Sequence, residues 1–162
     1  MQRRKEEIVL STVIIAVITF CYFAFDNSKM GYFNGSKFYT HFTYMFAHSS
    51  ILHLIVNSYV VYVSMNKNIL PLKELIAVST TIAILASFIT ASVAPTVGIS
   101  GILFVIIGFS YALRPTRLNT LYMILWFCIA AISPMNTMLH LVCFLTGLSY
   151  MIIRKKWQRK KT

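Results

Sequence analysis

The chain has 162 residues, of which 57% are hydrophobic and only 12% are charged, and it carries a formal net charge of +11. This composition is typical of a membrane protein and excludes an ordinary soluble enzyme. The positive charge would also suit a nucleic-acid-binding protein. However, the basic residues gather at the ends of apolar segments, as they do in membrane proteins, so no nucleic-acid partner is expected.

Six apolar segments follow one another along the chain, each near the roughly 17–25 residues that a membrane-spanning helix needs. They cover about 8–25, 48–66, 73–93, 98–113, 118–133 and 136–153. Polar or helix-breaking stretches separate them: Asp26 to Ser36, Asn66-Lys67-Asn68 with Pro71, Ala94-Pro95-Thr96, Arg114 to Arg117, and Ser133-Pro134. We therefore predict an all-α membrane protein: one six-helix bundle over residues 1–162, with no soluble domain. No internal repeat is visible, which disfavours a duplicated transporter.

The basic residues are distributed unevenly between the two sides of the membrane that six crossings would define. If the N-terminus is cytoplasmic, only Lys29 and Lys37 lie outside, and the other thirteen of the fifteen Lys and Arg residues lie inside. The positive-inside rule then predicts both termini in the cytoplasm of a multi-pass protein, with the basic ends against anionic headgroups of the lipid bilayer. A bacterial cytoplasmic membrane is the expected location.

Two features of the sequence have alternative interpretations. The first segment follows a basic stretch, as a signal peptide would, but no small-x-small cleavage site follows it, so a retained helix is favoured. The three cysteines, Cys21, Cys128 and Cys143, are odd in number and fall within predicted helices. Packing, and not a disulfide framework, is their expected role.

Polar groups recur at one depth in the outer half of the predicted bundle. The second segment carries His53 and Asn57 in its first two turns, the fourth begins with Gly98-Ile99-Ser100-Gly101, and the sixth carries His140 near its start. All three segments run from outside to inside in this topology. At 1.5 Å per residue, the four polar side chains share a slab roughly 10 Å deep. Polar groups at membrane depth are usually functional.

The types and spacings of these residues suit acyl-transfer chemistry. His53 and Asn57 are four residues apart, so they share a helix face and can direct two hydrogen-bond donors at one point, as an oxyanion hole requires. Ser100 at a helix N-terminus lies beside unpaired backbone N–H groups and the positive end of the helix dipole. Gly98 and Gly101 permit close approach of a neighbouring helix or a substrate backbone.

Structural interpretations of the same residues compete with this hypothesis. A serine in a membrane helix usually bonds the carbonyl four residues earlier or a neighbouring helix, and we expect Ser79, Ser87 and Ser110 to do so. A lone membrane histidine is as often structural as functional. A Gly-x-Ser-Gly motif alone is weak. The shared depth of the four groups is what favours a functional site.

The residues resemble the rhomboid family of intramembrane serine proteases. The resemblance rests on Tyr44 to Asn57, which includes His48, His53 and Asn57, on Gly98-Ile99-Ser100-Gly101, and on His140 with Gly147 seven residues later. It covers essentially the whole chain and implies a rhomboid-like bundle. By resemblance, Ser100 is the nucleophile, His140 is its base, and His53 with Asn57 forms the oxyanion hole. His48 is expected to support the first external loop, while His41 has no matched role.

Several positions depart from the family pattern. Tyr39-Thr40 stands where many members have Trp-Arg, and Cys143 stands where a small residue is expected. Phe104 replaces a tyrosine four residues after the nucleophile; its ring can pack against His140 but cannot donate a hydrogen bond. The first external loop, about 26–47, is short. None of these departures removes a group that the chemistry requires.

The implied function is intramembrane endopeptidase activity by a Ser–His dyad. The only acids are Glu6, Glu7, Asp26 and Glu74, and none is predicted near His140, so no triad carboxylate is expected. The chain has no His-Glu-x-x-His and no membrane Asp pair, and no metal or other cofactor is expected. Substrates would be single-span membrane proteins, unwound near the outer end of their helix. The main alternative is a catalytically silent rhomboid-like protein that binds or escorts membrane helices; a small transporter is less favoured. The sequence leaves the oligomeric state open.

Overall fold

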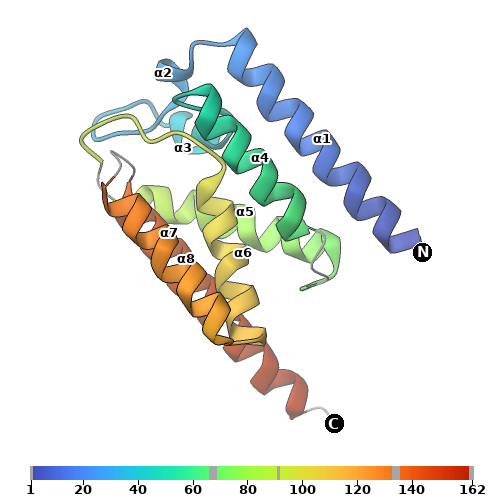
Figure 1. Cartoon of the computed structure of the whole chain (residues 1–162). Helices are drawn as coiled ribbons and strands as arrows, with labels where there is room; N and C mark the ends of the chain where they lie inside the picture. The colour runs from blue at the N-terminus through green and yellow to red at the C-terminus, as the bar shows by residue number, and fades with distance from the viewer. Residues whose placement is uncertain (1, 66–68, 91, 133–135, 161–162) are drawn as a thin grey trace.

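The computed structural model describes residues 2–65, 69–90, 92–132 and 136–160 of the chain. In these residues the regular elements are helices, and Figure 1 shows their arrangement. Six are long: α1 (Gln2–Ala24), α4 (Ile51–Met65), α5 (Leu72–Ile89), α6 (Ser100–Leu113), α7 (Arg117–Ile132) and α8 (Thr137–Arg159). Three are short and lie between α1 and α4: α2 (Asn27–Met30), α3 (Thr40–Thr43) and the 3-10 helix η1 (Tyr44–Phe46). The prediction of an all-helical protein is thus confirmed.

The helix ends differ from the predicted segments at several places. The second helix begins at Ile51 and not at residue 48, because Ser50 caps it by accepting the backbone N–H of His53. Helix α5 ends at Ile89, four residues before the predicted end, and the chain leaves it extended at Thr90. Helix α8 continues six residues past the predicted end to Arg159. The breaks predicted at Asn66-Lys67-Asn68 and Ser133-Pro134 lie outside the described residues.

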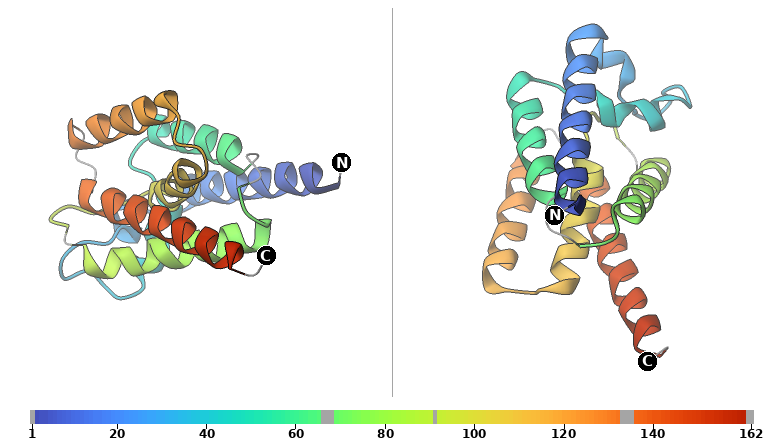
Figure 2. Two further views of the ribbon diagram at one scale, coloured as in Figure 1. Left: turned by 90° about the horizontal axis from the view of Figure 1, so that it is seen from below. Right: turned by 90° about the vertical axis from the view of Figure 1, so that its right-hand side faces the viewer.

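Helix α6 occupies the centre of the bundle, with the other long helices around it (Figure 2). Nine of its fourteen residues are buried, as expected for a helix that is apolar on every face. Its closest neighbour is α8, and two glycines allow this approach. A Cβ atom on Gly147 would lie 2.5 Å from the backbone oxygen of Val105, and one on Gly108 would collide with the backbone oxygen of Phe144. Substitution at either glycine would therefore push α6 and α8 apart.

The outer surface of the bundle is apolar in the way that a lipid environment requires. Large side chains such as Phe23, Leu52, Tyr59 and Ile89 are exposed, each by more than two thirds of its area. Helices α1, α5 and α8 are each long and apolar enough to cross a membrane, and α3–η1 with α4 would form a fourth, sharply bent span. Helix α6 is apolar but shorter. The chain is therefore a multi-pass membrane protein.

Both chain ends point away from the short helices of the first loop (Figure 1). At the end of the bundle near the C-terminus, Arg154 of α8 forms a two-point hydrogen-bonded ion pair with Glu74 of α5, with distances of 2.8 and 2.9 Å. The Tyr150 hydroxyl also donates to Glu74. Glu74 is therefore engaged at the opposite end of α5 from the first loop.

Candidate active site

The residues Ser100 and His140 come together across the α6–α8 contact. The Oγ atom of Ser100 lies 2.9 Å from Nε2 of His140, and the two are hydrogen-bonded. Both are buried, with 6% of Ser100 and 2% of His140 exposed. The glycine-mediated packing of α6 against α8 therefore brings together two polar groups that are forty residues apart in the chain.

The position of Ser100 in its helix determines what its hydroxyl can do. Ser100 is the first residue of α6, so no helical carbonyl precedes it by four residues. Serines inside the helices behave differently: Ser79 donates to the carbonyl of Leu75 and Ser110 to that of Ile106. The hydroxyl of Ser100 is thus free of a helical carbonyl and lies within hydrogen-bonding distance of the imidazole, so a neutral Nε2 can accept its proton.

His140 is oriented by packing and by its own helix. The Phe104 ring stacks on the imidazole, with ring centres 4.4 Å apart and planes inclined by 17°. Cys143, less than one turn later on α8, is fully buried. The second ring nitrogen, Nδ1, is buried and has no hydrogen-bond partner among the described residues. Among the described residues, no carboxylate therefore accepts a hydrogen bond from the His140 ring.

His53 and Asn57 of α4 direct their polar ends at Gly98, two residues before Ser100. A Cβ atom on Gly98 would lie 2.9 Å from Nε2 of His53 and 3.2 Å from Nδ2 of Asn57. Both nitrogens are buried without a partner among the described residues. Gly98 has φ +114°, a conformation that glycine alone adopts easily, so a glycine is needed here for both backbone and space. Two unsatisfied nitrogens therefore converge beside the serine.

Gly101 leaves room for the buried side chain of Tyr44. A Cβ atom there would lie 3.0 Å from the hydroxyl of Tyr44, which donates to the backbone oxygen of Ala83. The backbone N–H of Gly98 in turn donates to the Tyr44 carbonyl at 2.8 Å. Tyr44 is fully buried and connects η1, α5 and the turn before Ser100.

His48 stands between the first loop and the candidate site. Its backbone N–H donates to the side chain of Asn27 at 2.9 Å, and Asn27 also donates to the backbone oxygen of Tyr22 at the end of α1. Its ring is 1% exposed and packs edge-on against His53. Both ring nitrogens lack partners among the described residues. His48 therefore connects the end of α1 to the start of α4.

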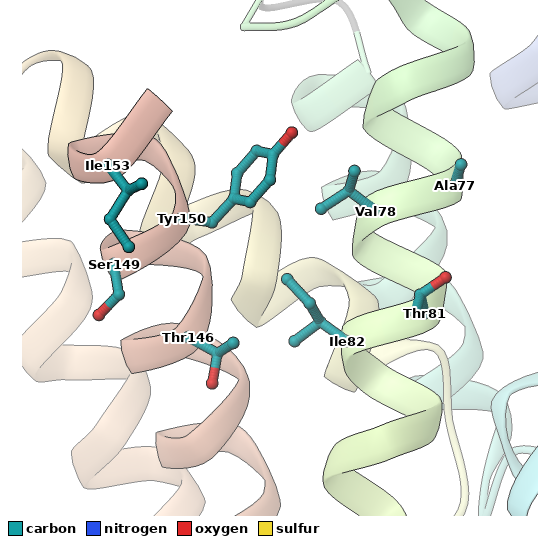
Figure 3. A pocket seen from close by; sticks show the side chains of 8 residues that line it. All are labelled: Ala77, Val78, Thr81, Ile82, Thr146, Ser149, Tyr150 and Ile153. Atoms are coloured by element: carbon teal, nitrogen blue, oxygen red, sulfur yellow. The ribbon is translucent and has the colours of Figure 1, made fainter. Parts of the chain in front are cut away.

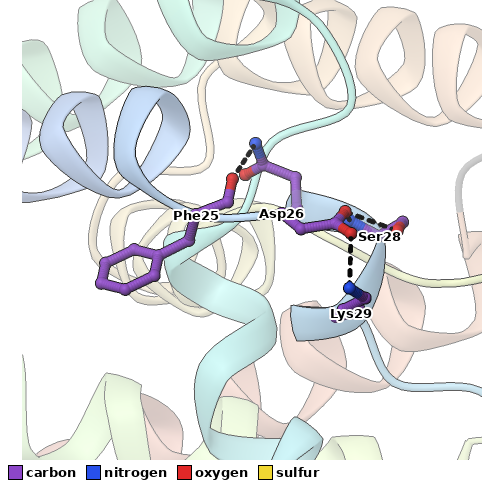
Figure 4. Close-up of polar contacts among 5 residues, drawn as sticks. Phe25, Asp26, Ser28 and Lys29 are labelled. Atoms are coloured by element: carbon purple, nitrogen blue, oxygen red, sulfur yellow. Dashed lines mark hydrogen bonds and ion pairs between the residues drawn. The ribbon is translucent and has the colours of Figure 1, made fainter.

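A cavity of about 760 Å³ opens beside His48 and Ser49, bounded by Tyr22, Phe25, Asn27, Pro95 and Val97 among others. Asp26 and Ser28 also line this cavity. Figure 4 shows the polar contacts within their turn. Asp26 accepts hydrogen bonds from the Ser28 hydroxyl and amide and forms an ion pair with Lys29 at 3.3 Å. These contacts, led by the Ser28 hydroxyl, lower the pKa of the Asp26 carboxyl. Ser49, which lines this cavity, contacts Nδ1 of His53 at 3.1 Å, so Ser49 lies between the cavity and the side chain of His53.

A second cavity, of about 470 Å³, lies between α5 and α8 and is lined by Ala77, Val78, Thr81, Ile82, Thr146, Ser149, Tyr150 and Ile153 (Figure 3). It contains hydroxyl groups but no histidine or carboxylate among its lining residues. The Tyr150 hydroxyl is already used by Glu74. This groove therefore lacks a base for acyl-transfer chemistry.

Two residues for which the sequence predicted no role, His41 and Asn136, form side-chain hydrogen bonds in the structure. His41 of α3 bonds Ser87 of α5, and Asn136 bonds the side chains of Tyr32 and Thr96. Neither lies in a recognisable motif. The place of Asn136, a residue type favoured at N-caps, at the start of the last predicted segment (136–153) was the signal that could have identified it.

The fold and the site define a multi-pass helical membrane protein with a buried serine–histidine hydrogen bond. Comparison with known families shows that residues 35–157 match the rhomboid domain. The chain belongs to the rhomboid family, as its sequence motifs predicted. A search of curated proteins found no match.

Proposed function

We propose that this chain is an intramembrane serine endopeptidase in which Ser100 is the nucleophile and His140 the general base. The observation that carries the proposal is the buried 2.9 Å hydrogen bond between Ser100 Oγ and His140 Nε2. The rhomboid family includes both proteases and inactive members, so membership by itself does not establish activity. The presence of both groups, already in hydrogen-bonding contact, favours the protease.

In the first half of the reaction, Ser100 Oγ attacks the carbonyl carbon of the scissile peptide bond while Nε2 of His140 takes the hydroxyl proton. The carbonyl oxygen becomes an oxyanion. The intermediate then collapses, the C–N bond breaks, and the imidazolium gives its proton to the leaving amine. In the second half, a water molecule attacks the acyl carbon while His140 takes a proton from it. The ester bond to Ser100 then breaks, and the imidazolium returns this proton to Ser100 Oγ.

The oxyanion would be stabilised by His53 and Asn57. Their side-chain nitrogens are buried, without partners in the described part of the chain, and directed at Gly98 beside Ser100. Unsatisfied buried donors cost free energy, which is recovered when a negative oxygen enters. Gly98 and Gly101 leave the space, and Phe104 and Gly147 hold His140 and α8 against α6. We assign His48 to support of the first loop, since its amide bonds Asn27.

Water and substrate must both reach this buried site. The cavity beside His48 and Ser49 supports access of water from the side of the first loop. Substrates would be single-span membrane proteins, because an intact helix hides its peptide bonds and must unwind locally at the site. The asymmetric distribution of basic residues supports a topology with both termini cytoplasmic and the site opening to the outer side.

The test is covalent labelling by a fluorophosphonate together with cleavage of a panel of single-span substrates by the purified protein in liposomes. Wild-type protein should be labelled at Ser100 and should cleave at least one substrate. Ser100→Ala should abolish both. The matched control is Ser110→Ala, which removes a hydroxyl from the same helix but only a bond to the Ile106 carbonyl.

Two results would overturn the proposal. One is cleavage by Ser100→Ala protein after contaminating proteases have been excluded. The other is a folded wild-type protein that is neither labelled nor active on the panel; this result would favour the silent rhomboid-like protein that binds or escorts membrane helices.

A further inference from the structure

A polar network outside the dyad joins three parts of the chain on the side of the first loop. Asn136, the N-cap of α8, donates from its side-chain amide to the Tyr32 hydroxyl at 2.8 Å and to Thr96 Oγ1 at 3.2 Å. Tyr32 belongs to the first loop, and Thr96 to the connection between α5 and α6. This network therefore links the segment before Ser100 to the helix that carries His140.

The directions of these hydrogen bonds can be deduced. Thr90 Oγ1 donates its proton to the carbonyl of Ala86, so it must accept from the Tyr32 hydroxyl at 2.9 Å. The Tyr32 hydroxyl, having donated to Thr90, accepts from Asn136. Thr96 Oγ1 likewise donates to Ser92 Oγ at 2.9 Å and accepts from Asn136. Two directed chains thus begin at the one amide group, and each residue along them has a defined role as donor or acceptor.

The same side chain sets the start of α8. Its oxygen, Oδ1, accepts the backbone N–H of Leu139 at 3.0 Å, and its backbone oxygen accepts the N–H of His140 at 3.3 Å. An N-cap bond of this kind contributes typically about 1 kcal/mol to helix stability. His140 is four residues from the cap. Its backbone is therefore positioned directly by Asn136.

The segment before Ser100, which contains Thr96, is connected to the same network through Tyr32. Tyr32 and Thr96 exchange two backbone hydrogen bonds, at 3.2 and 2.8 Å, in an isolated antiparallel bridge. Thr96 is four residues before Ser100. Tyr32 is only 1% exposed, and burial raises the pKa of its phenol, so the hydroxyl stays protonated and able to donate.

We propose that Asn136, acting with Tyr32, is the positioning residue that sets the distance between Ser100 and His140. His140 has no second hydrogen bond from a described residue at Nδ1, so its ring depends on Phe104 and on where α8 begins. In a Ser–His–Asp triad, a carboxylate orients the imidazole by a direct hydrogen bond. Here the Asn136 network orients it indirectly, because it fixes the backbone at the start of α8 and in the segment before Ser100. The catalytic part of this inference rests on the proposed function.

Two substitutions separate positioning from capping. Asn136→Asp keeps the oxygen that caps α8 but removes both N–H donors. Tyr32→Phe keeps the ring that packs against Tyr44 and removes the hydroxyl. The matched control is Tyr111→Phe, which removes the same group from a tyrosine that bonds Thr120 at the opposite end of α6.

Asn136→Asp and Tyr32→Phe should each lower kcat and the rate of fluorophosphonate labelling about tenfold or more, because small displacements of reacting groups are costly. KM and the unfolding temperature of Asn136→Asp should stay near wild type. The two substitutions should not be additive, since they break one chain of bonds. Tyr111→Phe should behave as wild type. Normal labelling and kcat in both test variants would overturn the inference.

A second measurement is independent of activity. The ¹⁵N chemical shift of His140 Nε2 reports its hydrogen bond to Ser100, and Ser100→Ala provides the value without that bond. Asn136→Asp should move the shift toward the Ser100→Ala value. An unchanged shift would overturn the positioning role. If Asn136→Asp changes the shift but the wild-type protein is neither labelled nor able to cleave a substrate, the positioning role is retained and the protease is rejected.

Discussion

Among the serine–histidine hydrogen bonds of the described residues, that of Ser100 with His140 and that of Ser87 with His41 differ in what the serine can do. Ser100 and His140 are 2.9 Å apart, and Ser87 and His41 are 3.0 Å apart. Ser87 lies inside α5, where its hydroxyl donates to the carbonyl of Ile84 at 2.6 Å. It can therefore only accept from Nδ1 of His41, whose ring is stacked on Tyr32 and Phe88. Ser100, at the start of α6, has no helical carbonyl to bond.

The comparison shows that a serine–histidine contact does not by itself define a nucleophile. Position in the helix decides whether a backbone carbonyl takes the hydroxyl proton, as at Ser87, or leaves it available to the imidazole, as at Ser100. The surroundings differ as well, since the unpartnered nitrogens of His53 and Asn57 converge beside Ser100. We interpret Ser87–His41 as a contact that holds α3 against α5.

The largest expected effect separates the two histidines. His140→Ala should lower the rate of substrate cleavage by on the order of 10⁴-fold or more, because the nucleophile loses its base. His41→Ala should leave the rate near wild type and should lower thermal stability modestly. Cleavage kinetics and thermal unfolding in detergent would measure both. Equal losses of activity in the two variants would remove the distinction between the pairs.

The next largest effect is expected from the side chains of His53 and Asn57, which lie beside the Ser100–His140 pair. His53→Ala and Asn57→Ala should each lower the cleavage rate by about 10²–10³-fold, as loss of one oxyanion donor does, while the fold survives. Initial rates with a fluorogenic membrane substrate would show this. A double variant that cleaves at the wild-type rate would eliminate these residues as the oxyanion hole.

The pH dependence should distinguish the pairs next. A protonated His140 cannot accept the Ser100 proton, so the rate should fall about tenfold per pH unit once this imidazole is protonated. Profiles of kcat/KM for wild type and His41→Ala should have the same acid limb. A flat profile well below pH 5 with folded protein, or loss of the limb in His41→Ala, would contradict the assignment of His140 as base.

The smallest expected effect tests the backbone beside the site. Gly98→Ala should lower activity several-fold and stability by about 1 kcal/mol or more, because it adds strain at positive φ and a contact with His53. Gly35→Ala is the matched control: Gly35 has φ +83° but open space around it. The Gly35→Ala protein should be less stable than wild type but equally active. Rates corrected for the folded fraction would separate the two effects.

Helix content and the candidate site residues were predictable from the sequence because both depend on local signals. Apolar length indicates the spans, and the spacing of His53 and Asn57 and the place of Ser100 in its segment indicate shared depth. The three short helices of the first loop were not predicted, since they are too short for a periodic pattern to show. The early end of α5 was missed because mostly apolar residues continue to Val93, whereas the backbone becomes extended at Thr90.

The sequence by itself determined the rhomboid family and the helical membrane fold, because composition and short motifs suffice for these. It also indicated candidate side chains for acyl transfer. Only the tertiary structure decided that Ser100 meets His140 while Ser87 meets His41, since both contacts join residues at least forty positions apart. It also showed Asn136 bonding Tyr32 and Thr96. The physical reason is that burial in a membrane strongly favours polar groups that have a partner, but which partner a group meets depends on how closely the helices pack. The glycines at 108 and 147 set that distance for α6 and α8.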